Sequence, residues 1–258
     1  MALPFLPPAS LDSAFIITRP KEADIDALSE VYFESFATDE GNTFWWSPDH
    51  DAMREWLRYR IQKKMADRSV RHFSVIDQRE GNVVVSFARW DIPKGYETRF
   101  GEWVGGDDAL DVSRVVAEHG TDEPATVAPV EEAEPTAVKT MAGPRGSDQE
   151  LCQSFFSVLS TLSKKWNAEQ MLGLSLLCTS PKYHRRGAAK ALLAPMLAIA
   201  DAAGLRTYLE ATPGGRPVYE KLGFRTVEVK EFNIDALTSG RIKGSYKLSI
   251  MIREPQAL

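Results

Sequence analysis

The alternation of apolar and polar residues predicts a domain that mixes strands and helices. A β-like stretch at 15–19 precedes two stripes of apolar residues at helical spacing. Ser47 followed by Pro48 is typical of the start of the second helix, with serine at the N-cap and proline in the first turn. Two β-rich stretches, 72–77 and 83–90, then flank a turn that contains Gly and Asn. They predict a β-hairpin.

In the second half of the chain, the pattern predicts a helix followed by alternating strands and helices. Ser147, with Glu150 three residues later, forms a capping box, so a helix is expected to begin there. The later elements are expected at 172–178 (strand), 188–203 (helix), 205–211 (strand), 216–222 (helix), 224–232 (strand) and 245–253 (strand). This order predicts an α/β fold, in the broad sense that includes α+β, in which a mixed sheet carries helices on both faces.

One stretch interrupts this pattern. Residues 92–146 are rich in Gly, Pro, Ala, Thr and acidic residues, and the part from 102 to 135 contains ten acidic residues and one arginine. Such a charged and weakly apolar composition predicts an insertion without fixed structure. Only its first aromatic part, 96–103, is expected to pack on the body of the protein. We therefore expect a single domain over 1–258 with an acidic insertion at 92–146.

Composition narrows the kind of partner. The formal charge of −5 argues against nucleic acid as a partner, because binding to a phosphate backbone needs a basic surface. No apolar run reaches the length that spans a membrane, so no membrane partner is expected. Cys152 and Cys178 are far apart in the sequence, which favours a reduced, cytoplasmic compartment. The four histidines have no metal-ligand spacing, so no metal is expected.

The most informative stretch is 172–194, where a β run leads into a short basic loop and then an apolar helix. The first turn of a helix has unpaired N–H donors and a partial positive charge, and a small residue such as Gly187 lets a phosphate approach the backbone. Arg185, Arg186 and Lys190 add full positive charges. The stretch therefore predicts a site for a diphosphate.

Two motifs make a family resemblance visible. Residues 181–189 read PKYHRRGAA, and residues 218–224 read VYEKLGF, with a helix and a strand between them. With the order of elements, they resemble the GNAT superfamily of acetyl-CoA-dependent N-acetyltransferases. The resemblance is close over 172–224 and topological over 15–90. It implies a mostly antiparallel central sheet that is flanked by helices and splayed between its two central parallel strands.

For the cofactor, the resemblance implies acetyl-CoA as co-substrate. The end of the first central strand would pair with the pantetheine arm as an added strand does, and the loop would hold the pyrophosphate through its N–H groups. His184 stands where the family usually has Gln or Arg, and Thr212 stands near the usual asparagine that contacts pantetheine. The cofactor-binding residues implied are Leu177, Cys178, Thr179, Arg185, Arg186, Gly187, Ala188, Ala189, Lys190 and Thr212.

Two residues are candidates for proton transfer. Tyr219 matches the tyrosine that in many family members protonates the departing CoA thiolate, and a neutral phenol can donate a proton to that anion or stabilise it. Glu210 lies near the end of a strand, on the same face as Tyr208, where a carboxylate would face the cleft. A general base and a salt-bridge partner are both open roles for it.

The acceptor side is less defined. Phe44, Trp45 and Trp46 lie in the loop between the first two helices, which in the family lines the acceptor pocket, and core packing is the alternative role for them. Backbone N–H groups near Cys178 or Thr179 would stabilise the oxyanion that forms when an amine attacks the thioester. Cys178 itself has no His or Asp partner in the sequence and is expected to be a buried structural cysteine.

These features predict a cytoplasmic N-acetyltransferase that moves an acetyl group from acetyl-CoA to a primary amine of a small molecule, by direct attack in a ternary complex. A protein or peptide acetyltransferase is one alternative. A non-catalytic acyl-CoA-binding module is another, and an interaction protein that uses its acidic insertion is a third. The chain is expected to be a monomer or a homodimer.

Overall fold

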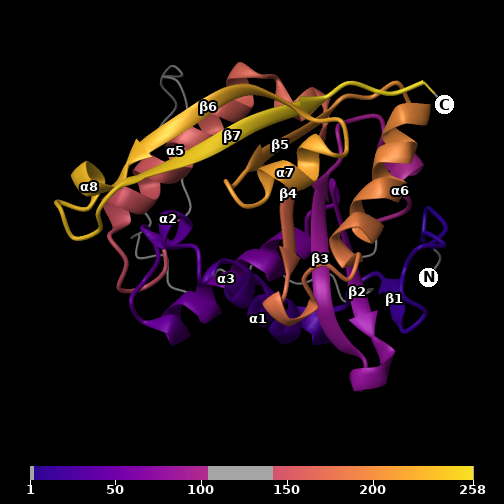
Figure 1. Cartoon of the computed structure of the whole chain (residues 1–258), viewed down its shortest axis with the longest axis horizontal. Helices are drawn as coiled ribbons and strands as arrows, with labels where there is room; N and C mark the ends of the chain where they lie inside the picture. Colours follow the sequence, from indigo (N-terminus) through magenta and orange to yellow (C-terminus); the bar gives the residue numbers. More distant parts are fainter. Residues whose placement is uncertain (1–2, 104–141, 258) are drawn as a thin grey trace, which may run out of the picture.

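A seven-stranded sheet forms the centre of the protein, in a computed structural model that describes residues 3–103 and 142–257 (Figure 1). The strands are β1 (Phe15–Thr18), β2 (Val70–Asp77), β3 (Val83–Asp91), β4 (Leu172–Thr179), β5 (Thr207–Ala211), β6 (Arg225–Asn233) and β7 (Ser245–Arg253). Their order in the sheet is β1-β2-β3-β4-β5-β7-β6. Within the described residues, only β4 and β5 pair in parallel. The mostly antiparallel, mixed sheet predicted from the sequence is therefore confirmed.

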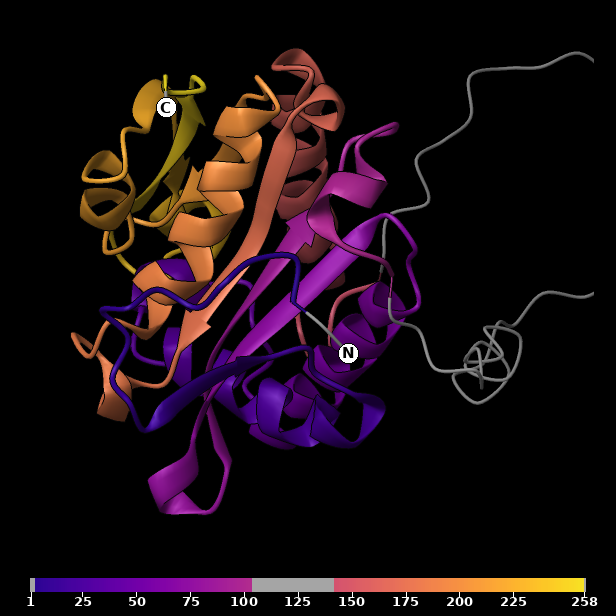
Figure 2. The same ribbon diagram turned by 90° about the vertical axis from the view of Figure 1, so that its right-hand side faces the viewer.

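Helices cover both faces of the sheet (Figure 2). One face carries α6 (Ala188–Ala202), and the opposite face carries α1 (Ile25–Phe36), α3 (His50–Met65) and α5 (Gln149–Lys165). The described residues also contain three short helices: α2 (Glu40–Thr43), α7 (Arg216–Glu220) and α8 (Ile234–Leu237). The alternation along the strands divides the core in two, since Trp90 packs with α6 whereas Phe87 packs with α1.

The two central strands separate after a short paired segment. β4 and β5 pair only where Leu172–Leu174 faces Thr207–Leu209, although β4 continues to Thr179. β3 holds the other edge of β4 as far as Thr179. A register shift next to Arg89 places Ser175 in a β-bulge, which bends the strand. The edge of β4 that faces β5 is consequently open over residues 175–179.

Two helix starts differ from the prediction. Asp49, not Ser47, is the N-cap of α3, and its carboxylate accepts the N–H groups of Asp51 at 3.0 Å and Ala52 at 3.1 Å. Asp148, not Ser147, is the N-cap of α5. An aspartate stands close to each expected serine and satisfies helix N–H groups with a charged acceptor. The Ser47 hydroxyl instead donates to the carbonyl of Arg145, at 2.6 Å.

Both ends of the acidic stretch are anchored in the body of the protein. Phe100 is fully buried on the α6 side of the sheet. On the other side, the Trp56 indole donates to the carbonyl of Ala142 at 2.8 Å. Of the predicted insertion, 92–146, residues 104–141 lie outside the described residues, whereas its ends at 92–103 and 142–146 are described. No helix in the described part is long and apolar enough to cross a membrane.

Candidate active site

The loop before α6 presents free backbone donors. Gly187 is the N-cap of α6 and has φ 85°, a left-handed conformation that glycine adopts without strain. A Cβ built on Gly187 would meet no atom within 4 Å, so the space in front of the helix is open. In the described structure, the backbone N–H groups of residues 185–190 donate to no protein acceptor. This is the geometry of an anion site at a helix N-terminus.

The charged side chains of this loop have different surroundings. Arg186 is tied to the sheet, because its guanidinium lies 3.3 Å from Asp77 and stacks over the ring of Phe15 at 4.5 Å. Nε2 of His184 lies 3.0 Å from the carbonyl oxygen of Thr179 and so joins the loop to the end of β4. Arg185, Gly187 and Lys190 are exposed, whereas Arg186 and Ala189 are half-buried and Ala188 is buried.

The open edge of β4 carries the three strand residues expected to contact the cofactor. The Thr179 hydroxyl is hydrogen-bonded to Ser86 at 2.8 Å, and Leu177 packs on the α6 side. Cys178 is fully buried, and burial raises the pKa of its thiol far above the usual range. That environment fits a structural cysteine and not a nucleophile. The backbone of these residues remains free to pair with a ligand on the side that faces β5.

Tyr219, on α7, lies across the opening from β4. Its ring packs edge-on against Phe224, with centroids 5.9 Å apart, and it lies within electrostatic range of Cys178. Burial raises the pKa of the Tyr219 hydroxyl above its usual value, so the phenol keeps its proton. The turn that leads into α7 is closed by Thr212, whose hydroxyl accepts the N–H of Gly215 at 3.1 Å.

On the other face of the sheet, the opening continues into a cavity of about 660 Å³ that α1, α3 and α5 enclose. Two rows of residues form its floor, and each row has one residue from each of the three central strands, β3, β4 and β5. The first row is Asp91, Gly173 and Tyr208, which are direct register partners. The second row lies two residues away along each strand and consists of Arg89, Ser175 and Glu210. Trp45, Trp46, Phe155 and Phe156 contribute an aromatic wall.

Glu210 has the electrostatic properties of a general base. Burial, with a smaller contribution from the nearby Asp91 charge, raises the pKa of its carboxyl group to about 7, although a hydrogen bond from the Tyr208 hydroxyl opposes the shift. That hydrogen bond is 2.9 Å long and fixes the carboxylate on the cavity floor. A carboxyl group that titrates near neutral pH is matched to proton abstraction at that pH.

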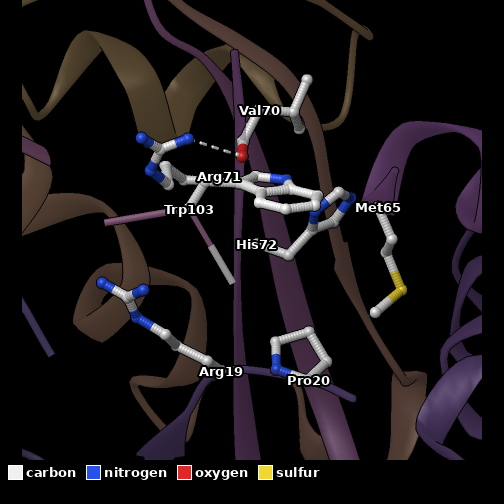
Figure 3. A pocket seen from close by; sticks show the side chains of 7 residues that line it. All are labelled: Arg19, Pro20, Met65, Val70, Arg71, His72 and Trp103. Carbon is white, nitrogen blue, oxygen red and sulfur yellow. Dashed lines mark hydrogen bonds between the residues drawn. The ribbon is translucent and has the colours of Figure 1, made fainter. Parts of the chain in front are cut away.

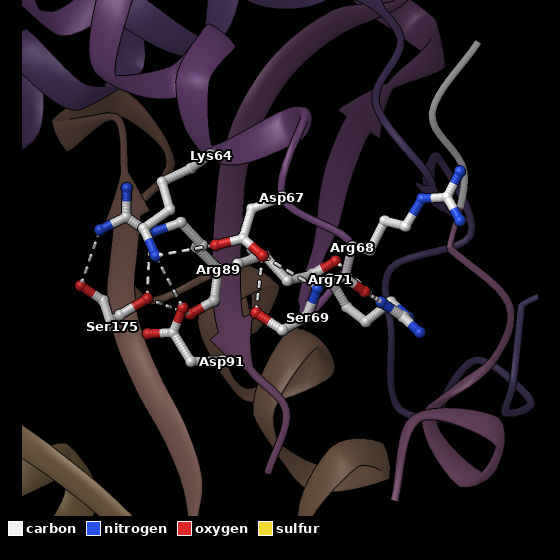
Figure 4. A network of polar contacts seen from close by, with 9 residues as sticks. Lys64, Asp67, Arg68, Ser69, Arg71, Arg89, Asp91 and Ser175 are labelled. Atoms are coloured by element: carbon white, nitrogen blue, oxygen red, sulfur yellow. Dashed lines mark hydrogen bonds and ion pairs between the residues drawn. The ribbon is translucent and has the colours of Figure 1, made fainter. Parts of the chain in front are cut away.

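Arg89 and its surroundings form a polar network beside Glu210 (Figure 4). Its Nε donates to the Ser175 hydroxyl at 2.9 Å, and its Nη2 donates to the Ser175 carbonyl at 3.4 Å. Lys64 lies 3.3 Å from Asp91 and 3.5 Å from Asp67, so those charges are paired with each other. His72, the cross-strand partner of Arg89, is neutral because burial lowers its pKa to about 3.

The cavity includes some predicted residues and several that sequence reasoning missed. Trp45 and Trp46 line it, whereas Phe44 is 1% exposed and packs in the core against Phe155 and Phe232. Lys64 lines the cavity as well. The other residues that the sequence analysis did not identify are Arg60, Arg89, Asp91 and Ser175. The charged residues Arg89 and Asp91, at alternate positions of the otherwise apolar strand β3, were the sequence signal that could have indicated a polar site there.

A second hollow lies beside β2 and is much smaller (Figure 3). It has a volume of about 20 Å³ and is lined by Arg71, His72 and Trp103 among others. That volume suits about one water molecule and excludes an acyl acceptor. Among the residues that the structure describes, no group of His, Cys, Asp and Glu could hold a metal ion.

The comparisons agree with this geometry. Residues 160–238 match the family model described as acetyltransferase (GNAT) domain, a stretch that includes β4, the loop before α6, β5 and α7. Residues 160–238 of the chain are thus similar to a GNAT acetyltransferase domain. No curated protein sequence matches the chain.

Solved structures share the fold at low sequence identity. One, from Corynebacterium glutamicum, is titled histone acetyltransferase HPA2 and related acetyltransferase; it is 18% identical, with 95% of this chain and 98% of that chain covered and a TM-score of 0.52. The polyamine N-acetyltransferase of Drosophila melanogaster is 10% identical, with 93% and 99% covered and a TM-score of 0.54. Mosquito arylalkylamine N-acetyltransferase like 5b is 12% identical, with 93% and 99% covered and a TM-score of 0.51.

Proposed function

We propose that this protein transfers an acetyl group from acetyl-CoA to a primary amine of a small molecule, by direct attack in a ternary complex. The observation that carries the proposal is Glu210: a carboxyl group with a pKa of about 7 on the floor of a half-open cavity, beside the opening between β4 and β5. The cofactor would enter from the α6 side, and the amine would enter from the cavity.

The α6 loop supports the cofactor half of the proposal. The N–H groups of residues 185–190 would donate to the diphosphate of CoA, with Gly187 allowing close approach and Arg185 and Lys190 adding charge at the rim. The open edge of β4 over residues 177–179 would pair with the amide groups of pantetheine, as an added strand does. The thioester would then reach the opening between β4 and β5.

Proton transfer would follow from the two titratable groups. Glu210 would accept the proton of the attacking amine, directly or through a water, so that the nitrogen lone pair can form the new N–C bond. An N–H group of β4 near Cys178 would stabilise the oxyanion. The C–S bond then breaks, and the electron pair leaves on the CoA sulfur. The Tyr219 hydroxyl would stabilise that thiolate by a hydrogen bond, and its raised pKa favours this role over complete proton transfer.

The cavity supports a small acceptor. Its volume, about 660 Å³, lies within the range of about 300–1,000 Å³ typical of small-molecule pockets. Helices α1, α3 and α5 cover it, which leaves less room for an extended peptide than an open groove would. Two proteins of the same fold are named for polyamine and arylalkylamine acceptors, in line with an amine acceptor here.

The test measures free CoA thiol released from acetyl-CoA in the presence of a panel of small amines and a panel of peptides. We expect acetyl-CoA to bind and at least one small amine to release thiol and form the N-acetyl product. Release with peptides alone would replace the small-molecule proposal by a protein acetyltransferase. Binding of acetyl-CoA with no release for any acceptor would favour a non-catalytic acyl-CoA-binding module, and no binding at all would reject the proposal.

A further inference from the structure

Three buried hydrogen-bond donors on the cavity lining have no acceptor. They are Nη1 of Arg89, Nε1 of Trp45 and Nε1 of Trp46. In the described part of the chain, every unsatisfied buried side-chain polar atom of the lining residues is an N–H donor. The great majority of buried hydrogen-bond donors in proteins have an acceptor, and a donor without one requires an explanation. A ligand that supplies an oxygen acceptor to the cavity floor would give Nη1 of Arg89 a partner after a small movement of the side chain.

Among the described residues, Arg89 forms no ion pair, although Asp91 lies within electrostatic range of it. The residue is 3% exposed, and its hydrogen bonds go to the neutral hydroxyl and carbonyl of Ser175. The nearby Asp91 is already paired with Lys64, and Glu210 accepts a hydrogen bond from Tyr208. A buried cation without an anion is costly, because burial removes it from water. The cavity therefore favours a ligand with negative charge.

We propose that the acceptor amine also carries a carboxylate, which Arg89 binds on the cavity floor while the amine lies at Glu210. This inference rests on the proposed acetyl transfer and names its acceptor class: amino acids and other amino-carboxylates with an apolar body. A planar guanidinium matches a carboxylate in charge and in hydrogen-bond geometry.

The register of the sheet supports one molecule that contacts both groups. Arg89 and Glu210 stand in the same row of the floor, with β4 between their strands. Paired neighbouring strands lie about 4.8 Å apart, and β4 and β5 separate after Leu174 and Leu209, so the Cα atoms of Arg89 and Glu210 are roughly 10 Å apart or more. Both side chains line the cavity. The aromatic wall from Trp45 to Phe156 suits the apolar body of such a molecule.

The first experiment compares kcat/KM for matched acceptors with and without the carboxylate: phenylalanine with phenethylamine, tryptophan with tryptamine, and straight-chain ω-amino acids with their decarboxylated amines. We expect the carboxylate member to be better by about ten- to hundredfold in at least one pair, since hydrogen bonds to charged groups are the stronger kind. Equal or higher kcat/KM for the amine member in every pair would overturn the proposal.

The second experiment uses Arg89→Met, which keeps the length and apolar part of the side chain. For the preferred carboxylate, kcat/KM should fall about ten- to hundredfold, mainly through KM, and should change less than about threefold for the paired amine. Arg58→Met removes the same charge from the outer side of α3, where Arg58 pairs with Asp26, and should leave both members unchanged. An equal loss for both members of a pair in Arg89→Met, with acetyl-CoA binding intact, would show a structural role and overturn the proposal.

A binding measurement separates this inference from the proposed reaction. Calorimetry without CoA would compare N-acetylphenylalanine, which keeps the carboxylate, with N-acetylphenethylamine, on the wild type and on Arg89→Met and Arg89→Lys. We expect tighter binding of the carboxylate ligand to the wild type, loss in Arg89→Met and partial recovery in Arg89→Lys. This result would stand even if no acceptor released thiol. Equal binding of the two ligands to the wild type would contradict the inference while leaving the acetyl transfer itself untouched.

Discussion

The two sides of the opening between β4 and β5 are built from different groups. On the α6 side, the loop at 185–190 offers backbone N–H groups at an exposed helix end, and its functional geometry depends on one glycine. On the α1, α3 and α5 side, the cavity offers polar and charged side chains from three neighbouring strands, with the charges on β3 and β5. The first design suits the constant diphosphate of a cofactor. The second suits an acceptor whose chemistry differs from one protein to the next.

The loop and the cavity also differ in the strength of their electrostatic interactions. The loop is in contact with water, so its fixed charges are screened, and its specificity comes from the number and direction of N–H donors. In the cavity, burial raises the pKa of the Glu210 carboxyl group to about 7. Substitutions that keep the shape but remove charge should therefore act strongly in the cavity and weakly in the loop.

The largest expected effect belongs to Glu210→Gln. The amide keeps an oxygen to accept the Tyr208 hydrogen bond but cannot take a proton, so kcat/KM should fall about 10²–10³-fold while the dissociation constant of acetyl-CoA stays unchanged. The wild-type kcat/KM should rise with pH through about 7, because the carboxylate form of Glu210 is the base. In the variant, only the rise from the acceptor's own ammonium group at higher pH should remain.

Glu169 provides the matched control, since it lines the same cavity but is exposed. Glu169→Gln should keep kcat/KM within about twofold of the wild type and retain the rise near pH 7, because an exposed carboxylate contributes little here. If Glu210→Gln kept the wild-type rate and pH profile, the general base would not be Glu210. The contrast between a loop of backbone donors and a cavity with a catalytic side chain would then be contradicted.

Gly187→Asp tests the loop in the corresponding way. A carboxylate against the diphosphate adds like-charge repulsion, which costs several kcal/mol, so the affinity for acetyl-CoA should fall more than about hundredfold by fluorescence or calorimetric titration. Gly187→Ala is the control: its Cβ meets no atom within 4 Å, although φ 85° strains a non-glycine residue. It should lower the melting temperature but change the affinity less than about threefold. Unchanged binding in Gly187→Asp would place the diphosphate elsewhere.

The same contrast explains how much of the molecule could be predicted from its sequence. The fold was accessible because each strand and helix has its own period, and the final strand was predicted with the observed bounds, Ser245–Arg253. The helix starts at Ser47 and Ser147 were wrong because Asp49 and Asp148 compete for the same N–H groups. Such competition between neighbouring caps depends on geometry that a motif does not contain.

The two halves of the site were unequally predictable for a related reason. The loop is local: its residues are adjacent in the sequence, so PKYHRRGAA alone indicates an anion site. The cavity is not local, since Arg89 meets Ser175 from 86 residues away, and the bulge at Ser175 sets which side chains share the floor. Alternation suggested that Tyr208 and Glu210 share a face, but no sequence period identifies Arg89 as their neighbour.

Tyr219→Phe should have a smaller effect than the change at Glu210. Removing the hydroxyl takes away one hydrogen bond to the leaving thiolate, so kcat should fall about tenfold, whereas acetyl-CoA binding should stay within about twofold. Because the ring packs on Phe224, phenylalanine fills the same space. Tyr183→Phe is the control, since that hydroxyl is hydrogen-bonded to Glu80 below the loop. A Tyr219→Phe enzyme with the wild-type kcat would restrict this tyrosine to a packing role.

The smallest effect on the cofactor is expected for Arg186→Met, which distinguishes a loop built from backbone donors from one built from charged side chains. The Arg186 guanidinium already contacts Asp77 and Asp12 and stacks on Phe15, so it is engaged on the protein side. Its loss should weaken acetyl-CoA binding less than about threefold while lowering the stability by roughly 1 kcal/mol, because the buried Asp77 carboxylate loses a partner. Titration with acetyl-CoA and thermal unfolding measure both quantities. A loss of affinity greater than about tenfold with unchanged stability would mean that Arg186 leaves Asp77 to bind the diphosphate, and the loop would then resemble the cavity in its use of side-chain charge.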